Sequence, residues 1–438
     1  MSVFKAYDIR GLFPEEINEE LAYKFGRAFV TFLNCKEVVV GYDMRSSSEV
    51  LCSALIKGII DQGAKVYNIG LASTPMLYFA AKDKEAAIMI TASHNPGEFN
   101  GFKLCRNNAM PISGETGIKE IEKLIENPFV EVEKGEEIKL NIIDKFIEHN
   151  MNFFNENNLK IVFDFGNAIG AYSHKLIWDK LNFTKIYMYD ELDGNFPNHI
   201  PDPLNLDNVK DLQKKVVEEN ADFGVAIDGD ADRCVFIDEK GQYISSDLIT
   251  ALIAKEILSN NPGEKILYDL RSSKSVKEVI RENKGFPVKS RVGHSFIKSQ
   301  MREENSIFAG ELSGHFYYRD SFFTESSIIT VMKIMNLVKD NSLSRLIQPI
   351  KRYFSSGEIN SDVEDKETKM KEIESKFSSA KNILWLDGLT VEFEDWWFNL
   401  RPSNTENKLR LNLEANSQIL MEQKRDEVLS MVRNIIKT

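Results

Sequence analysis

The sequence predicts a multidomain α/β chain whose last part is an α+β domain. Its 438 residues exceed what one hydrophobic core normally supports, which suggests about three or four domains. Most of the chain alternates short apolar runs with helical stretches, a pattern typical of parallel α/β sheets. The final part instead has several short strands close together and one amphipathic helix, which indicates an α+β domain.

The first α/β unit is expected over residues 1–145. An apolar strand over Val38–Val40 is followed by a helix over about 46–62, whose serines can serve as caps. Further strands are predicted at Lys65–Ile69 and Ala86–Ile90, so strand and helix alternate as in a parallel sheet.

Three further units are expected over residues 146–243, 244–354 and 355–438. The second has predicted strands at 160–166, 185–189 and 223–227 and helices near 172–181 and 208–220. The third has predicted strands at 265–268 and 307–309 and helices near 275–283 and 296–301. The fourth opens with a charge-dense stretch at 355–374, interpreted as a domain boundary plus a solvated helix. Its predicted strands are 383–385, 389–393, 396–400 and 409–413, and its helix is 418–436.

Charge and cysteine content narrow the class of protein. The net charge is −12 and no dense Lys/Arg cluster is present, which argues against nucleic acid and against anionic membranes as partners. Four widely spaced cysteines without a CxxC pair are typical of reduced thiols. The N-terminus lacks a signal-peptide pattern, and no apolar run approaches the ~20 residues of a membrane span. We therefore expect a cytoplasmic protein that acts on small molecules.

A polar loop, Thr91–Pro96, follows the predicted strand Ala86–Ile90. Ser93 should therefore lie just beyond the carboxyl end of a strand, where open α/β sheets place their ligand sites. A single serine in a loop is usually a turn residue. Here three more polar loops of the same kind follow along the chain, which favours a functional role.

The second loop carries Asp228, Asp230 and Asp232 at alternating positions. Three carboxylates on one tight turn repel each other and can converge on a hard cation, and an oxygen-only donor set suits Mg²⁺ better than zinc. An EF-hand is excluded because Arg233 stands where that loop needs glycine and predicted strands, not helices, flank the turn. A solvated acidic loop is the remaining alternative.

The third and fourth loops suit a sugar and a phosphate. In Gly310–His315, Glu311 and Ser313 can hold paired sugar hydroxyls and His315 can move a proton near neutral pH. The stretch Arg401–Glu406 offers a guanidinium, hydroxyls and backbone N–H groups, a suitable phosphate cradle, although the same residues also form ordinary turns. Neither GxGxxG nor GxxxxGK[ST] occurs, so dinucleotide binding and a P-loop kinase have no support.

Five motifs, in order along the whole chain, resemble those of the α-D-phosphohexomutases in their phosphomannomutase/phosphoglucomutase branch: Ala6–Gly11, Thr91–Lys103, Asp228–Arg233, Gly310–His315 and Arg401–Glu406. The resemblance implies three similar mixed α/β domains and a smaller α+β domain around a central cleft. It assigns the phosphoserine to residues 1–145, the metal to 146–243, sugar recognition to 244–354 and phosphate binding to 355–438.

The same resemblance implies a role for each matching residue. Ser93 carries the phosphoryl group, with Lys103, Arg10 and His315 as the other catalytic residues. Mg²⁺ is bound by Asp228, Asp230, Asp232 and the phosphoryl group on Ser93. The implied substrate contacts are Tyr7, Arg233, Arg271, His294, Glu311, Ser313, Arg401, Ser403, Asn404 and Thr405. In the family, the residues matching Tyr7 and Arg10 reach the phosphoserine loop.

The implied reaction interconverts hexose 6-phosphate and hexose 1-phosphate. Ser93 gives its phosphoryl group to the sugar, and the resulting glucose 1,6-bisphosphate, or its mannose analogue, turns around and returns the other phosphate. Mannose and glucose are both compatible substrates, and the chain is expected to act as a monomer or dimer. Alternatives are a phosphoglucosamine mutase or a strictly phosphoglucose mutase, a non-catalytic sugar-phosphate-binding protein and, with less support, a phosphatase.

Several residues depart from the family pattern or have an open interpretation. Thr324–Ser327 stands in place of an acidic pair followed by a small residue, and Asn407 stands in place of a proline. Arg45 is either a surface ion-pair residue or part of the site. His199 is interpreted as a hydrogen-bonded loop residue rather than a catalyst.

Overall fold

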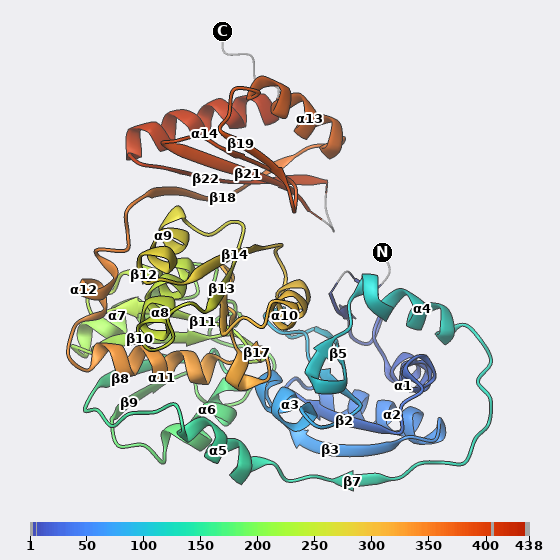
Figure 1. The fold of residues 1–438 in the computed structure, drawn as a ribbon. Coiled ribbons are helices and arrows are strands. Elements are labelled where there is room, and N and C mark those ends of the chain that lie inside the picture. Colours follow the sequence, from blue (N-terminus) through green and yellow to red (C-terminus); the bar gives the residue numbers. More distant parts are fainter. Residues whose placement is uncertain (1–2, 6, 404–406, 434–438) are drawn as a thin grey trace. The chain divides into compact units, whose positions relative to one another are not determined.

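The computed structural model describes residues 3–5, 7–403 and 407–433, which divide into two units. The first unit comprises residues 1–246 and 293–346, and the second comprises residues 247–292 and 347–438. Among the helices of these described stretches, none is long and apolar enough to cross a membrane. Each unit is described separately below, with element labels as in Figure 1.

The first sheet of the first unit is mixed and has the order β1-β5-β4-β2-β3-β7, with β6 paired to β5. Its strands are β1 (Ile9–Leu12), β2 (Glu37–Tyr42), β3 (Lys65–Leu71), β4 (Ala86–Ile90), β5 (Phe99–Arg106), β6 (Met110–Pro111) and β7 (Glu137–Lys139). Strand β2 runs parallel to β3 and β4, whereas β5 is antiparallel to β4 and β1. The helices are α1 (Glu19–Leu33), α2 (Ser48–Asp61), α3 (Thr74–Ala81) and α4 (Lys119–Ile125).

Alternating side chains of these strands fill two separate cores. Val38 and Ile88 pack in one core with residues of α1 and α2. Val39 and Met89 point to the opposite core with residues of α3. Strand β4 is therefore buried on both faces, which explains its uninterrupted apolar sequence.

The second sheet of this unit has the order β12-β11-β10-β8-β9. Its strands are β8 (Lys160–Asp164), β9 (Thr184–Met188), β10 (Phe223–Ile227), β11 (Cys234–Asp238) and β12 (Tyr243–Ile244), and its helices are α5 (Ile143–Met151), α6 (Gly170–Trp178) and α7 (Lys210–Glu218). Strand β8 runs parallel to β9 and β10, and β10 runs antiparallel to β11. Residues Asp228–Arg233, called the aspartate loop below, thus form a tight connection between the antiparallel strands β10 and β11.

The remaining elements of the first unit form a small antiparallel meander and helices. They are α10 (His294–Glu303), β15 (Phe308–Gly310), β16 (Phe316–Tyr318), β17 (Thr324–Glu325), α11 (Ser327–Val338) and α12 (Leu343–Ile347). Strand β16 is antiparallel to both β15 and β17. Helix α10 begins at His294, two residues before the start of the predicted helix near 296–301.

The second unit contains a parallel strand pair and an antiparallel sheet. The first group is α8 (Ser246–Asn260), β13 (Lys265–Asp269), α9 (Lys274–Glu282) and β14 (Phe286–Ser290). The second is β18 (Phe354–Asp362), α13 (Lys366–Lys376), β19 (Asn382–Trp385), β20 (Leu389–Glu392), β21 (Trp396–Pro402), β22 (Lys408–Ala415) and α14 (Gln418–Val432). The sheet order is β18-β22-β21-β20-β19, and residues of α13 and α14 complete its core. In Figure 1 both helices lie over one face of this sheet.

The structure confirms the α+β pattern at the end of the chain and corrects one element there. Residues 355–362, interpreted from sequence as a boundary and solvated helix, belong to β18, and only α13 is helical. Strand β18 is an edge strand whose side chains are mostly exposed. Its sequence therefore lacks the apolar alternation that marks a half-buried strand.

Candidate active site

The loop Thr91–Pro96, called the serine loop below, begins directly after β4. Ser93 has a φ of +51° and is 1 % exposed. Its backbone N–H donates to the Thr91 hydroxyl at 2.9 Å, which supports this uncommon conformation. The Ser93 hydroxyl lies 3.2 Å from Nδ1 of His94 and donates to Oδ2 of Asp228 at 3.1 Å. The structure thus brings the serine and the aspartate loop together.

Arg45 is a buried clamp for this loop, not a surface ion-pair residue. Its guanidinium donates to the carbonyl oxygens of Ser93 at 2.8 Å, Asn95 at 2.6 Å, Pro96 at 2.6 Å and Phe99 at 2.9 Å. Its Nε lies 3.3 Å from Asp43, and the Arg45 residue is 3 % exposed. One planar cation therefore fixes the path of the backbone on both sides of the serine.

The aspartate loop approaches the serine loop so closely that its single glycine, Gly229, is required. A Cβ added to Gly229 would lie 2.0 Å from the carbonyl oxygen of Ser93. Ala231 adopts a φ of +65°, which completes the tight turn between β10 and β11. As a result Asp228, Asp230 and Asp232 are all buried, with exposures of 0 %, 0 % and 1 %.

The three aspartates fit a hard divalent cation. One carboxylate oxygen from each lies within 4.8 Å of the others. Oδ1 of Asp230 is buried without a hydrogen-bond donor, and Oδ1 of Asp232 has no partner nearer than the His315 imidazole at 3.3 Å. Buried carboxylate oxygens with no donor are costly unless a cation or proton satisfies them, and a purely oxygen donor set suits Mg²⁺.

Lys103 supplies positive charge beside the same carboxylates. Its ammonium donates to Asp230 and, at 2.6 Å, to Oδ2 of Asp232. Although burial disfavours its charged form, the three aspartates outweigh this effect and raise the pKa of Lys103. Thr74 donates to Asp230 at 2.5 Å, a contact that sequence inspection did not identify. Lys103 is therefore a cation in this site rather than a base.

Charge is distributed unevenly over the aspartates. Burial and the two neighbouring carboxylates raise the pKa of Asp228 well above its ordinary value. Burial acts in the same direction on Asp232, but Lys103 and His315 outweigh it and hold its pKa well below the ordinary value. Such divergent pKa values in one buried cluster are typical of functional sites.

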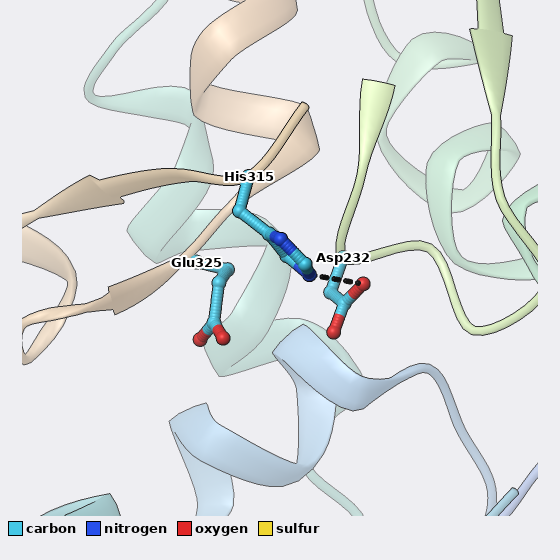
Figure 2. Close-up of side chains that lie close together, drawn as sticks. All are labelled: Asp232, His315 and Glu325. Atoms are coloured by element: carbon cyan, nitrogen blue, oxygen red, sulfur yellow. Dashed lines mark ion pairs between the residues drawn. The ribbon is translucent and has the colours of Figure 1, made fainter. Parts of the chain in front are cut away.

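His315 reaches this cluster from the loop between β15 and β16. Its Nε2 lies 3.3 Å from Oδ1 of Asp232, the ion pair drawn in Figure 2. Its Nδ1 lies 2.8 Å from the Ser313 hydroxyl and 3.2 Å from Glu311, which also accepts from Tyr317 at 2.9 Å. Burial and Arg233 disfavour the imidazolium, but Asp232 and Glu311 raise the pKa of His315 to about 9.

Three other sequence-predicted residues of the first unit lie around this centre. Arg10 donates to the Asn95 side chain of the serine loop at 2.6 Å. Arg233 directs its backbone N–H to Asp228 at 3.0 Å. The ring centroid of His294 lies 6.2 Å from that of His315.

Tyr7 packs on the first turn of α10. Its ring centroid is 6.2 Å from that of His294 and 5.8 Å from that of Phe296. The role at the serine loop implied for Tyr7 stays a prediction.

Departures from the family pattern at 324–327 have a local structural role. The Ser326 hydroxyl accepts from the Ile329 N–H at 3.2 Å and so caps α11. The Ser327 hydroxyl donates at 2.6 Å to the carbonyl of Ala231, inside the aspartate loop. These serines therefore support the site without acting as acids.

In the second unit, three arginines converge on one carboxylate. Glu358 on β18 lies 3.3 Å from Arg410, 3.7 Å from Arg401 and 3.7 Å from Arg271. The register pairs Arg401 directly with Arg410 across β21 and β22, so their like charges need a counterion. Glu358 was missed in the sequence because it falls in the charge-dense stretch interpreted as a boundary.

Of the remaining predicted phosphate contacts, the structure describes Ser403 but not Asn404 or Thr405. Ser403 is 3 % exposed, and its N–H donates to the Lys408 carbonyl at 2.9 Å. Asn404 and Thr405 lie outside the residues that the structure describes.

Comparisons with known proteins cover the chain from end to end. Models of the phosphoglucomutase/phosphomannomutase family match in order along the sequence: α/β/α domain I at residues 1–130, α/β/α domain II at 143–241, α/β/α domain III at 245–353 and the C-terminal domain at 358–431.

Individual relatives are similar over nearly their full length. A protein named phosphomannomutase from Salmonella typhimurium is 40 % identical over 453 residues, covering 99 % of each chain. One of the same name from Methanocaldococcus jannaschii is 39 % identical over 443 residues, covering 99 % of this chain and 98 % of its own. The solved structure of a phosphoglucomutase/phosphomannomutase family protein from Burkholderia thailandensis matches with a TM-score of 0.93 and 31 % identity, covering 98 % of this chain and 97 % of that one.

Proposed function

Since the chain belongs to the phosphoglucomutase/phosphomannomutase family and is a hexose-phosphate mutase, we propose that Ser93 carries the phosphoryl group it transfers. The observation that carries this assignment is the hydrogen bond from the buried Ser93 hydroxyl to Asp228, one of three clustered aspartates. A free serine hydroxyl is a weak nucleophile, so the resting enzyme works in its phosphorylated form.

The proposal includes Mg²⁺ held by Asp228, Asp230 and Asp232, whose clustered buried carboxylates, with Oδ1 of Asp230 lacking a donor, support this choice. When bound, the ion withdraws charge from a phosphoryl group on Ser93 and so favours its transfer. Lys103 and Arg10 add fixed positive charge on the protein side. Phosphoryl transfer depends chiefly on positioning and electrostatic stabilisation of this kind.

The first chemical step then transfers the phosphoryl group from Ser93 Oγ to a hydroxyl oxygen of the sugar. The free hydroxyl of the sugar phosphate attacks the phosphorus, the bond from phosphorus to Ser93 Oγ breaks, and the hydroxyl proton leaves to a base. His315, beside Asp232 and Ser313, is proposed to accept that proton in its neutral form, which its raised pKa makes the minor form near neutral pH. The product is a hexose 1,6-bisphosphate. The same step in reverse returns its other phosphate to Ser93, so no co-substrate is consumed.

The substrate's own phosphate is proposed to bind to the arginine cluster of the second unit, formed by Arg271, Arg401 and Arg410 with Ser403. The convergence of these guanidinium groups on Glu358 supports the assignment, because phosphate oxygens, like carboxylate oxygens, are anionic acceptors for guanidinium N–H groups. Glu311, Ser313, His294, Arg233 and Tyr7 complete the proposed sugar and phosphate contacts.

The relatives named phosphomannomutase, at about 40 % identity, favour mannose phosphates as substrates. Glucose 1,6-bisphosphate or the mannose analogue is proposed as the activator. A cytoplasmic location, with the chain as a monomer or dimer, completes the proposal, and four buried free thiols are compatible with a reducing compartment.

An assay with three substrates tests this function. We expect mannose 1-phosphate to be converted to mannose 6-phosphate, with glucose 1-phosphate as a second substrate and glucosamine 1-phosphate turned over least. Ser93→Ala should lose turnover while still binding the sugar phosphate. Full turnover by Ser93→Ala would exclude Ser93 as the carrier, and a preference for glucosamine 1-phosphate would exclude the proposed sugar.

A further inference from the structure

A buried ionic network lies beside His294 and has no place in the mechanism above. Glu325 on β17 and Lys298 on α10 are both 0 % exposed, and Tyr78 on α3 is 1 % exposed. The Lys298 ammonium donates to Oε2 of Glu325 at 3.0 Å and to the Tyr78 hydroxyl at 2.9 Å. One oxygen of Glu325 is therefore fixed by a buried ammonium, which is itself bonded to the buried Tyr78 hydroxyl.

The other oxygen of Glu325 faces His294. Oε1 of Glu325 and Nδ1 of His294 lie 3.6 Å apart, and neither has a hydrogen-bond partner in the structure although both atoms are buried. A shift of less than ~1 Å would bring them to the distance of about 2.8 Å usual for a charge-assisted hydrogen bond. Unpaired buried polar atoms are strongly disfavoured, which makes this pairing the natural completion of the network.

The geometry of helix α10 explains why His294 and Lys298 both face the carboxylate of Glu325. His294 and Lys298 are four residues apart on this helix and so lie on the same face. Figure 2 places Glu325 beside His315, and ligand atoms of Glu325, His315 and Asp232 lie within 4.8 Å of one another. The network is thus adjacent to the site through His315 and Asp232 but shares no residue with the aspartate loop.

We propose that Glu325 is a positioning residue that holds His294 as the tautomer protonated on Nδ1. Nε2 then remains a hydrogen-bond acceptor for a sugar hydroxyl. The Lys298 ammonium, itself bonded to the Tyr78 hydroxyl, holds Oε2 of Glu325 and so orients Oε1 toward His294. The inference rests on the proposed role of His294 as a substrate contact.

Two further observations support the assignment. Burial, together with Lys298, Lys103 and His315, lowers the pKa of His294 well below its ordinary value, so its ring is neutral and has a single N–H. The His294 side chain is 16 % exposed, whereas its Nδ1 is buried, so the accessible part of the ring is elsewhere. A partner on one ring nitrogen commonly sets the tautomer and frees the other nitrogen for a ligand.

The test is the tautomer of His294 in the free, full-length protein, read by ¹⁵N NMR of a histidine-labelled sample. The chain has six histidines, and the His294 signal is identified by its loss in His294→Asn. We expect Nδ1–H in the wild type. In Glu325→Gln the amide oxygen should stay on Lys298, which turns the amide NH₂ toward His294 and reverses the tautomer to Nε2–H.

The kinetic consequence should follow the tautomer. We expect kcat/KM for the hexose phosphate to fall roughly ten- to hundredfold in Glu325→Gln. Glu414→Gln, which neutralises another buried carboxylate, is the matched control and should leave the His294 signal unchanged. The buried His174, bonded to Ser173 and Ser327, is an internal reference that should not respond.

Each result decides the proposal. Nε2–H in the wild type, an unchanged tautomer in Glu325→Gln, or a reversed tautomer with unchanged kcat/KM would overturn it. The wild-type spectrum alone suffices for the first of these results if Glu325→Gln does not fold. A responsive tautomer in a wild-type protein that turns over no hexose phosphate would overturn the proposed function and not the pairing of Glu325 with His294.

Discussion

Replacing Arg45 by methionine should release the serine loop from its scaffold. The substitution keeps much of the side-chain volume but removes a buried cation that donates to four carbonyl oxygens between Ser93 and Phe99. It also leaves Asp43 buried at 1 % exposure without its ion-pair partner. Breaking a buried pair by removing one partner typically costs about 3–5 kcal/mol. We take the lower end, about 3 kcal/mol, because the freed carbonyls can bond water when the loop opens.

Hydrogen exchange of the loop amides measures this cost locally. The N–H of Asn95 bonds to the Ala92 carbonyl and that of Phe99 to the Pro96 carbonyl, so both report opening of the loop. A loss of about 3 kcal/mol corresponds to roughly hundredfold faster exchange at these amides, since 1.4 kcal/mol is about tenfold. Phosphorylation of Ser93 should fail in parallel.

The matched control is Arg27→Met. Arg27 is similarly buried, at 6 % exposure, but bonds to Gln62 and to the Val130 carbonyl. The Arg27→Met substitution should leave hydrogen exchange in the serine loop unchanged. Exchange in Arg45→Met within threefold of the wild type would refute the claim that Arg45 determines the shape of this loop.

Three further outcomes are expected. Gly229→Ala should abolish phosphorylation of Ser93, because the new Cβ would lie 2.0 Å from the Ser93 carbonyl oxygen; normal labelling would contradict that close approach. Asp230→Asn should weaken Mg²⁺ binding by more than about tenfold in calorimetry, and unchanged affinity would remove Asp230 from the ligand set. His199→Asn should lower thermal stability at pH 6 more than at pH 8. Burial lowers the pKa of His199, but the hydrogen bond and charge of Asp164 outweigh burial and raise that pKa. The stability contributed by the imidazolium is therefore present below the unfolded pKa near 6.5 and is lost as pH rises through the folded pKa. An equal loss at both pH values would show that charge does not stabilise this pair.

The sequence was informative where a function depends on residues close together in the chain. Ser93 and the three aspartates stand directly after apolar runs that form β4 and β10, and strand ends of this kind commonly carry ligand sites. These loops and the alternation of strands and helices predicted the fold class and the family, and the matches to the four family domains confirmed both.

Residues whose partners are distant in sequence could not be found in this way. Arg45 acts on backbone carbonyls about fifty positions away, and a carbonyl acceptor has no sequence signature. Lys298 meets Tyr78 across 220 positions, so neither predicts the other. Glu358 was hidden on an exposed edge strand whose composition is that of a linker.

The central claim is that Ser93 carries a phosphoryl group. It is tested most directly by intact-protein and peptide mass spectrometry before and after incubation with glucose 1,6-bisphosphate. We predict one phosphate per chain, on the peptide that contains Ser93, and no gain in Ser93→Ala. Absence of phosphate on Ser93 under every loading condition, or its appearance on another residue, would contradict the phosphoserine mechanism.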